Sequence, residues 1–233
     1  MNRWITLSLT LALGLAACAS QAPLTDPVAR GKRDFQTKGC MRCHRLGDEG
    51  SEYGPGPNLT MVGFRKSSAW IARWLANPHD WNPKTLMPNL HLTTQQISDL
   101  ADFLSIQKGQ AWKVYPWRTK DALGMPSKDR GDLIFNMAGC VGCHGPNGTG
   151  GKPDNNVAGG MIPTLTLVSD GYTKAELIQK ITNGVTPLPA DPSKPKPMIV
   201  MPRWGDMLTQ DEIGAVADYL ISLHPKNKSS DGF

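Results

Sequence analysis

The chain has 233 residues, 39% of them hydrophobic and 19% charged, and a formal net charge of +5. This length fits one large domain or two of about 100 residues, and the composition excludes a wholly disordered chain. Its 5 Cys are too few for a disulfide scaffold, while 24 Gly and 19 Pro favour short elements joined by turns. The positive charge gathers in residues 108–130, with 6 basic and 2 acidic side chains, so we expect no nucleic-acid binding.

The first residues have the pattern of an export signal. Arg3 precedes an apolar run over residues 5–17, which is too short to span a bilayer. The run ends Leu15-Ala16-Ala17-Cys18, which resembles the cleavage box of bacterial lipoproteins. This resemblance implies a signal peptide over residues 1–17, acylation of Cys18 and a tether over residues 18–27. The mature protein would then be periplasmic and anchored by lipid to a membrane, with the outer membrane favoured. The alternative is ordinary signal cleavage, with Cys18 as a small apolar residue.

Two short helices are predicted 100 residues apart. Gly31 and Phe35 lie four positions apart, and so do Gly131 and Phe135. Positions four apart are neighbours on one helix face. A small residue beside a large one favours a close crossing with another helix.

A five-residue motif follows each of these predicted helices. The copies are Cys40-Met41-Arg42-Cys43-His44 and Cys140-Val141-Gly142-Cys143-His144. C-x-x-C-H is the attachment pattern of c-type haem, in which two thiols add across the vinyl groups and the His binds the iron. A zinc half-site or a redox dithiol would explain the Cys pairs, but would leave both His residues unexplained. We therefore predict two covalently bound haem c groups.

A Met-Pro step and a last helix close each half of the chain. Met87-Pro88 and Met201-Pro202 each precede a Thr-x-x-Gln or Thr-x-x-Glu capping box, at Thr93 and Thr209. Apolar stripes at positions i, i+3 and i+6 follow, at Ile97, Leu100, Phe103 and at Ile213, Val216, Tyr219. The chain is therefore interpreted as an internal duplication.

Each half resembles a class I cytochrome c in the order of helix, C-x-x-C-H, loop-rich middle, Met-Pro and last helix. The expected fold is all-α and loop-rich, with two tandem class I cytochrome c domains at residues 28–107 and 128–224. A basic linker is expected at residues 108–127, and a polar tail at 225–233.

The resemblance also implies the residues around each iron. Met87 and Met201 would be the sixth ligands, and a Met ligand raises the reduction potential. His91 and His79 compete with Met87 in the first half, and Met198 and Met207 compete with Met201 in the second.

Three further residues are implied near the haem groups. The Pro57 carbonyl would accept the Nδ1–H of His44, Pro163 would do the same for His144, and Arg65 would pair with a haem propionate. Val168-Ser169-Asp170 stands where the second half would need such an Arg. We therefore expect the two haem potentials to differ.

The tryptophans and the basic linker allow less specific interpretations. Trp70 and Trp74, on a helix expected to end at Pro78, are interpreted as haem-pocket packing. Trp81, Trp112 and Trp117 are interpreted as covering the domain junction. Five basic residues of the linker region form either a solvated surface or a docking surface for an acidic partner: Lys113, Arg118, Lys120, Lys128 and Arg130.

With both axial positions of each iron filled, the resemblance implies a membrane-tethered periplasmic dihaem electron carrier. Such a carrier is not an enzyme, and we expect no small-molecule substrate. Its partners would be other redox proteins or a membrane oxidoreductase complex. The alternative is that the chain is the cytochrome subunit of a larger oxidoreductase complex. A dihaem peroxidase is disfavoured, because it needs an open iron site and a longer chain.

Overall fold

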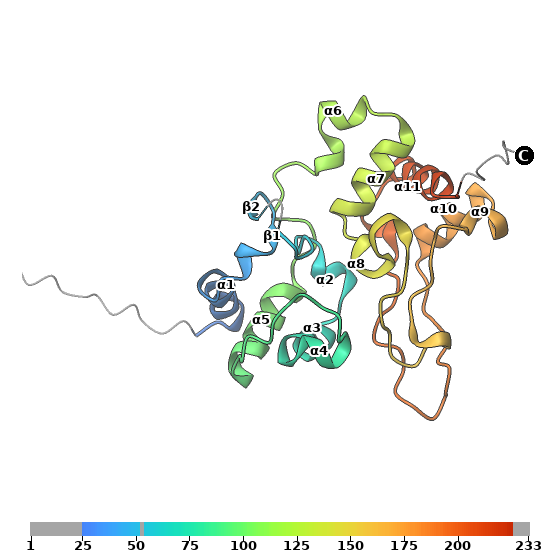
Figure 1. Ribbon diagram of the computed structural model, residues 1–233. Coiled ribbons are helices and arrows are strands. Elements are labelled where there is room, and N and C mark those ends of the chain that lie inside the picture. Colours follow the sequence, from blue (N-terminus) through green and yellow to red (C-terminus); the bar gives the residue numbers. More distant parts are fainter. Residues whose placement is uncertain (1–24, 52–53, 226–233) are drawn as a thin grey trace, which may run out of the picture.

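The computed structural model describes residues 25–51 and 54–225 (Figure 1). The expected signal peptide, Cys18 and all but the end of the tether lie outside the described residues, as does the polar tail after residue 225. Within the described ranges, no helix is long and apolar enough to cross a membrane. The described part is helix-rich, with one small antiparallel sheet, which confirms the predicted all-α, loop-rich fold.

The elements follow one another in two similar series. The first half contains α1 (Pro27–Thr37), the 3-10 turn η1 (Cys40–Arg42), β1 (Arg45–Leu46), β2 (Glu49–Gly50), α2 (Val62–Arg65), α3 (Ser68–Ala76), α4 (Pro78–Trp81) and α5 (Thr94–Ser105). The middle contains η2 (Pro116–Arg118) and α6 (Lys120–Leu123). The second half contains α7 (Ser127–Met137), α8 (Val141–His144), η3 (Pro146–Gly148), η4 (Ala158–Gly160), α9 (Val168–Gly171), α10 (Lys174–Asn183), η5 (Trp204–Asp206) and α11 (Gln210–Ser222).

The first and last helices of each half cross closely, as the glycine pattern predicts. A Cβ atom at Gly31 would lie 2.0 Å from Asp99 O on α5, and one at Gly131 would lie 2.0 Å from Ala215 O on α11. The aromatic residue one turn later packs on the same partner helix, with ring centroids 5.7 Å apart for Phe35 and Phe103. The two halves thus repeat one packing unit.

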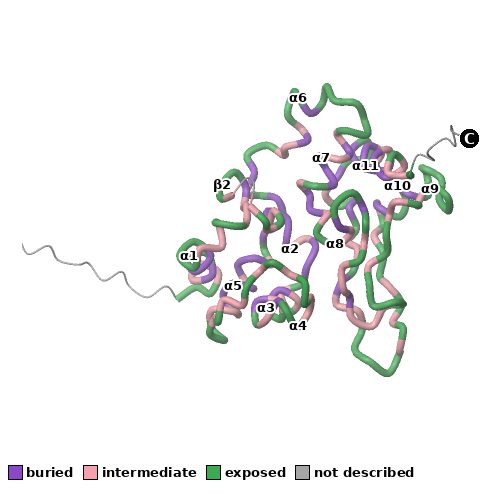
Figure 2. The backbone as a smooth tube through the Cα atoms, viewed as in Figure 1, coloured by how far each residue is buried: buried purple, intermediate pink, exposed green. Residues whose placement is uncertain are grey.

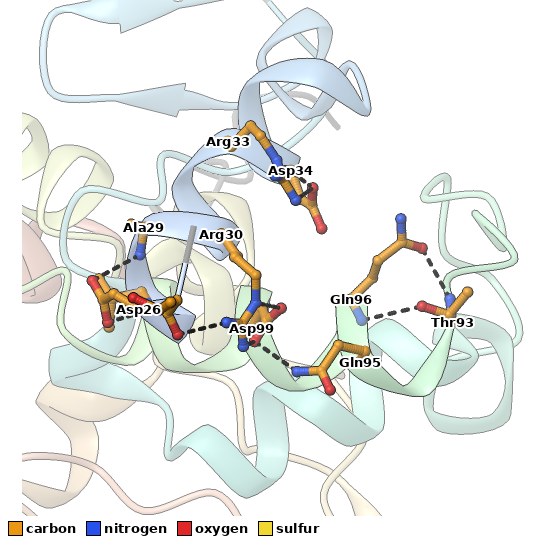
Figure 3. Close-up of polar contacts among 11 residues, drawn as sticks. Asp26, Ala29, Arg30, Arg33, Asp34, Thr93, Gln95, Gln96 and Asp99 are labelled. Carbon is orange, nitrogen blue, oxygen red and sulfur yellow. Dashed lines mark hydrogen bonds and ion pairs between the residues drawn. The ribbon is translucent and has the colours of Figure 1, made fainter. Parts of the chain in front are cut away.

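Polar contacts join α1 to α5 at this crossing (Figure 3). Arg30 donates from Nε and Nη2 to the two carboxylate oxygens of Asp99, at 2.7 Å each. The predicted capping box of α5 is present, since Thr93 Oγ1 accepts from Gln96 N at 3.2 Å and Gln96 Oε1 accepts from Thr93 N at 3.0 Å. Thr209 and Glu212 form the predicted box at the start of α11.

Buried residues lie inside both halves of the molecule (Figure 2). They form two clusters, and the buried residues of the linker region belong to the second. The first cluster surrounds α1, α3 and α5. The second surrounds α7 and α11, and it includes Trp112 and Trp117 from the linker and Met61 from the first half. Trp117 is 0% exposed. The middle segment is therefore packed against the second half, in a cluster that also includes a residue of the first half.

Candidate haem sites

The first Cys motif lies on a tight turn directly after α1. Gly39 has φ +78°, a left-handed conformation that glycine adopts without steric cost, and it reverses the chain before η1. His44 N donates to Cys40 O at 3.0 Å, which closes the turn. Cys40 and Cys43 are both free thiols. The turn therefore presents two thiols and an imidazole from five consecutive residues.

His44 has the backbone contact that the resemblance implies. Its Nδ1 lies 2.9 Å from Pro57 O. A carbonyl oxygen can only accept, so Nδ1 carries the proton and Nε2 keeps its lone pair. Burial lowers the pKa of His44, although the Pro57 hydrogen bond opposes this shift. The loop is tight here, since a Cβ at Gly56 would lie 2.6 Å from ring atoms of His44. The neutral imidazole is thus oriented with Nε2 available to a metal.

The second motif repeats this geometry on α8. His144 N donates to Cys140 O at 2.9 Å, and Cys140 and Cys143 are free thiols. Burial raises the pKa of Cys140 to about 12, so this thiol is protonated at neutral pH.

The contact between His144 and Pro163 is only partly formed. Burial lowers the pKa of His144 to about 4, the Pro163 carbonyl opposes this shift and Lys66 adds to it. His144 Nδ1, however, is buried with no hydrogen-bond partner among the described residues. Pro163 therefore faces the ring without making the 2.9 Å bond that Pro57 makes.

Met87 reaches the core beside the first motif. It packs against the same buried cluster as Cys40 and Met41. Its Sδ accepts a hydrogen bond from Trp74 Nε1 at 3.0 Å, and Trp74 stacks on Trp70 with ring centroids 5.4 Å apart. The sulfur is therefore directed inward from the loop, whereas its competitors His79 and His91 are both exposed.

Met201 occupies the matching place in the second half. Its backbone exchanges two hydrogen bonds of 2.9 Å with Val185, which hold the loop before η5. Its side chain packs against the same cluster as Cys140 and Val141. Of its competitors, Met207 joins this cluster too, while Met198 lies near Arg73 of the first half.

Arg65 lies between the two halves, a position that the sequence did not predict. Its Nη2 donates to Asn58 O at 3.1 Å in its own half, and its Nη1 donates to Gly139 O at 3.0 Å beside the second Cys motif. Nε is buried with no partner among the described residues and is free to bind a carboxylate such as a propionate. Trp81 also spans the junction, donating from Nε1 to Pro153 O at 3.1 Å.

The basic residues near the linker divide into two kinds. Arg118 forms a two-pronged ion pair with Glu212 of α11, at 2.6 and 2.9 Å, and Arg130 pairs with Asp211 at 2.6 Å. Arg118 thus holds the middle segment on the second half, and Arg130, on α7, donates from Nε to Trp117 O of that segment at 3.1 Å. The lysines at positions 113, 120 and 128 stay exposed.

These residues fit c-type haem. Each half offers two unpaired thiols on one turn, a half-buried neutral imidazole and a thioether sulfur packed against the same cluster as the first Cys. Among the described residues there is no group of three or more His, Cys, Asp or Glu side chains that could hold a metal ion. The donors that are present in each half, one imidazole and one thioether, suit an iron whose other ligands come from a porphyrin.

Comparison with known proteins agrees with this interpretation of the site. Residues 28–108 and 129–224 match the family Cytochrome c, and the chain belongs to this family. Its members hold covalently bound haem c, and membership supports the predicted electron-carrying, non-catalytic role.

Two curated relatives are named as subunits of nitric oxide reductase. The chain is 29% identical over 89 residues to the protein from Stutzerimonas stutzeri, covering 36% of this chain and 61% of the relative. It is 30% identical over 105 residues to the protein from Halomonas halodenitrificans, covering 40% of this chain and 69% of the relative. A solved chain of the reducing HAO-like protein complex of Kuenenia stuttgartiensis aligns with TM-score 0.30 at 19% identity, covering 84% of this chain and 96% of that one.

Proposed function

We propose that the chain is a dihaem electron-transfer protein, with one haem c in each of two domains at residues 28–107 and 128–224. Cys40, Cys43 and His44 would hold the first haem and Cys140, Cys143 and His144 the second, with Met87 and Met201 as the sixth ligands. The observation that carries this proposal is the repetition of one turn, which twice brings two free thiols and a half-buried neutral imidazole beside the core that the Met packs on.

The chain's residues would set the properties of each iron. When bound, haem supplies a one-electron ferric/ferrous couple. The thiols would attach it to the turn, and the Pro57 hydrogen bond orients His44 so that its Nε2 lone pair is available to the iron. Met87 and Met201 would supply the other protein ligands, so neither iron would have a site for a substrate. Arg65 Nε remains available to a haem propionate.

The names of the relatives favour one of the two physiological settings. Both relatives are subunits of an oxidoreductase by name, and this supports the alternative in which the chain works as the electron-transfer subunit of a membrane-associated complex. A free periplasmic shuttle between redox partners is the other setting. The apparent mass on a native gel after mild detergent extraction separates them, because a subunit migrates with its complex and a carrier migrates alone.

The lipid anchor is proposed from the sequence. Cys18→Ser would block acylation, so the protein should move from the membrane fraction to the soluble periplasmic fraction. Wild-type protein that is already soluble would refute the anchor.

The ligand sets are tested by optical spectroscopy of the purified holoprotein. Wild type should contain two haems per chain, show low-spin spectra and bind no carbon monoxide when reduced. Met87→Ala and Met201→Ala should each open one iron, so that carbon monoxide shifts half of the haem absorbance. Met207→Ala is the matched control, since Met207 packs on the same cluster as Met201. Carbon monoxide binding to wild type, or to Met207→Ala in place of Met201→Ala, would refute these assignments.

A further inference from the structure

Two buried cations from the first half lie at the second haem motif. Arg65 is 7% exposed and Lys66 is 8% exposed. Arg65 ends α2, which lies beside α8 (Figure 1), and donates to Gly139 O, one residue before Cys140. Lys66 directly follows α2, and its Nζ lies 4.4 Å from the centroid of the Trp70 ring. Burial lowers the pKa of Lys66, while Cys143 of the second motif and Asp154 oppose this shift.

The second motif leaves room for the arginine. A Cβ atom at Gly139 would lie 2.5 Å from Arg65 Cζ, and one at Gly142 would lie 2.9 Å from Arg65 Nη1. Gly142 stands inside the second C-x-x-C-H, where the first motif has Arg42. The absence of a side chain at this position therefore allows the cation to approach.

Among the described residues of the second half, no Arg or Lys is buried. Its α9 corresponds to α2 in order and length, but it ends at Gly171 where α2 ends at Arg65. Asp170 of α9 pairs instead with His224 at 2.8 Å. The buried cations at the second motif thus come from the end of α2 in the first half.

Two buried cations require negative charge or hydrogen-bond acceptors nearby to offset the cost of their burial. In the described part of the chain, neither Arg65 nor Lys66 forms an ion pair, and Arg65 Nε has no hydrogen-bond partner. The carboxylate that acts on Lys66 is Asp154, on the second half. Buried unpaired charge is costly, so it persists where a bound group or a function compensates for it.

We propose that Arg65 and Lys66 are the cationic groups of the second haem site, supplied across the domain junction, and that they raise the reduction potential of that haem. This rests on the proposed presence of one haem in each half. A ferric centre carries one more positive charge than a ferrous one, so a nearby cation favours the ferrous state. A unit charge about 12 Å from a redox centre, at an effective dielectric constant of about 20, changes a one-electron equilibrium about tenfold.

The test is a spectroelectrochemical titration of the full-length holoprotein. Met201→His marks which midpoint belongs to the second haem, because replacing Met sulfur with imidazole lowers that potential. In Lys66→Gln we expect the electron-exchange equilibrium between the two haems to shift about tenfold toward reduction of the first. Asp154→Asn removes the opposing charge and should shift the same equilibrium the other way.

Two further variants complete the design. Arg65→Gln should act like Lys66→Gln where it folds. Lys194→Gln is the matched control on the second half, since its side chain is 68% exposed and its charge is screened by water, and it should leave both midpoints in place. A merely structural role for the junction would not produce opposite shifts from Lys66→Gln and Asp154→Asn.

The result that overturns the inference is an unchanged second midpoint in both Lys66→Gln and Asp154→Asn, with two haems per chain. Haem content is measured independently as the pyridine haemochrome. A wild-type content of one haem per chain would instead refute the proposed function, and the inference with it.

Discussion

Alanine at Gly131 tests the helix crossing on which the second half is built. The new Cβ would lie 2.0 Å from Ala215 O, 2.5 Å from Ala215 C and 2.9 Å from Tyr219 Cβ. Two of these three atoms belong to the backbone of α11 and cannot rotate away. The helices must therefore separate, and the packing of Phe135 on Tyr219, with ring centroids 5.3 Å apart, loosens with them.

The expected magnitude follows from two opposing effects. Alanine is favoured over glycine inside a helix by about 1 kcal/mol. Overpacking a dense core costs about 1–3 kcal/mol and sometimes more. Because the contact at Gly131 is with backbone at 2.0 Å, we expect the upper end of this cost and a net loss of about 2 kcal/mol in the free energy of unfolding.

Gly214 supplies the matched control, because it lies inside α11 and a Cβ atom there would meet nothing within 4 Å. Gly214→Ala should therefore raise the free energy of unfolding by about 0.5–1 kcal/mol. Both variants are compared with wild-type holoprotein by urea unfolding, followed by far-ultraviolet circular dichroism. If Gly131→Ala matched or exceeded the wild-type stability, the close crossing would be absent from the folded protein and the reasoning refuted.

Two further predictions concern single side chains. Trp74→Phe removes the N–H that donates to Met87 Sδ, and this makes the sulfur a stronger electron donor. In a redox titration the midpoint potential of the first haem should therefore fall, while that of the second stays the same. An unchanged midpoint of the first haem would contradict this prediction. Burial raises the pKa of Glu212, but the hydrogen bonds from Arg118 and Thr209 and the charges of Arg118 and Arg130 outweigh it, so the pKa lies below its ordinary value. The resulting stability is present above the unfolded pKa of about 4.3 and is lost as pH falls through the lower folded value. Glu212→Gln should cost about 2–4 kcal/mol at pH 7 and flatten the acid limb of the stability profile. Asp211→Asn, with a side chain 81% exposed, should cost under about 1 kcal/mol, and equal losses in the two variants would refute the role of burial.

Local sequence patterns predicted most of the elements. The boxes at Thr93 and Thr209 specify where α5 and α11 begin, because a side-chain oxygen and a backbone N–H three residues away satisfy each other within one turn. The spacing of Gly31 and Phe35 indicated a close crossing, because four residues make one turn of helix. A third box, at Thr173 before α10, has the same signature and was missed in the sequence analysis.

The composition of the candidate haem sites could also be predicted, for a similar reason. The ligands of each site come from short motifs whose order repeats, and the His44–Pro57 contact joins residues only 13 positions apart. The resemblance to one family supplied the rest. The second half shows the limit of this reasoning, since Pro163 faces His144 with weaker geometry than the repeat implies.

The sequence by itself determined the duplicated fold, the two C-x-x-C-H turns and the Met candidates, because each depends on contacts within a helical turn or on one repeated motif. Only the tertiary structure decided where the buried side chains of Arg65 and Lys66 lie. Arg65 reaches Gly139 across 74 residues of chain, and Arg118 reaches Glu212 across 94. Such contacts depend on how two folded halves pack against each other, and periodicity along a chain carries no information about that packing.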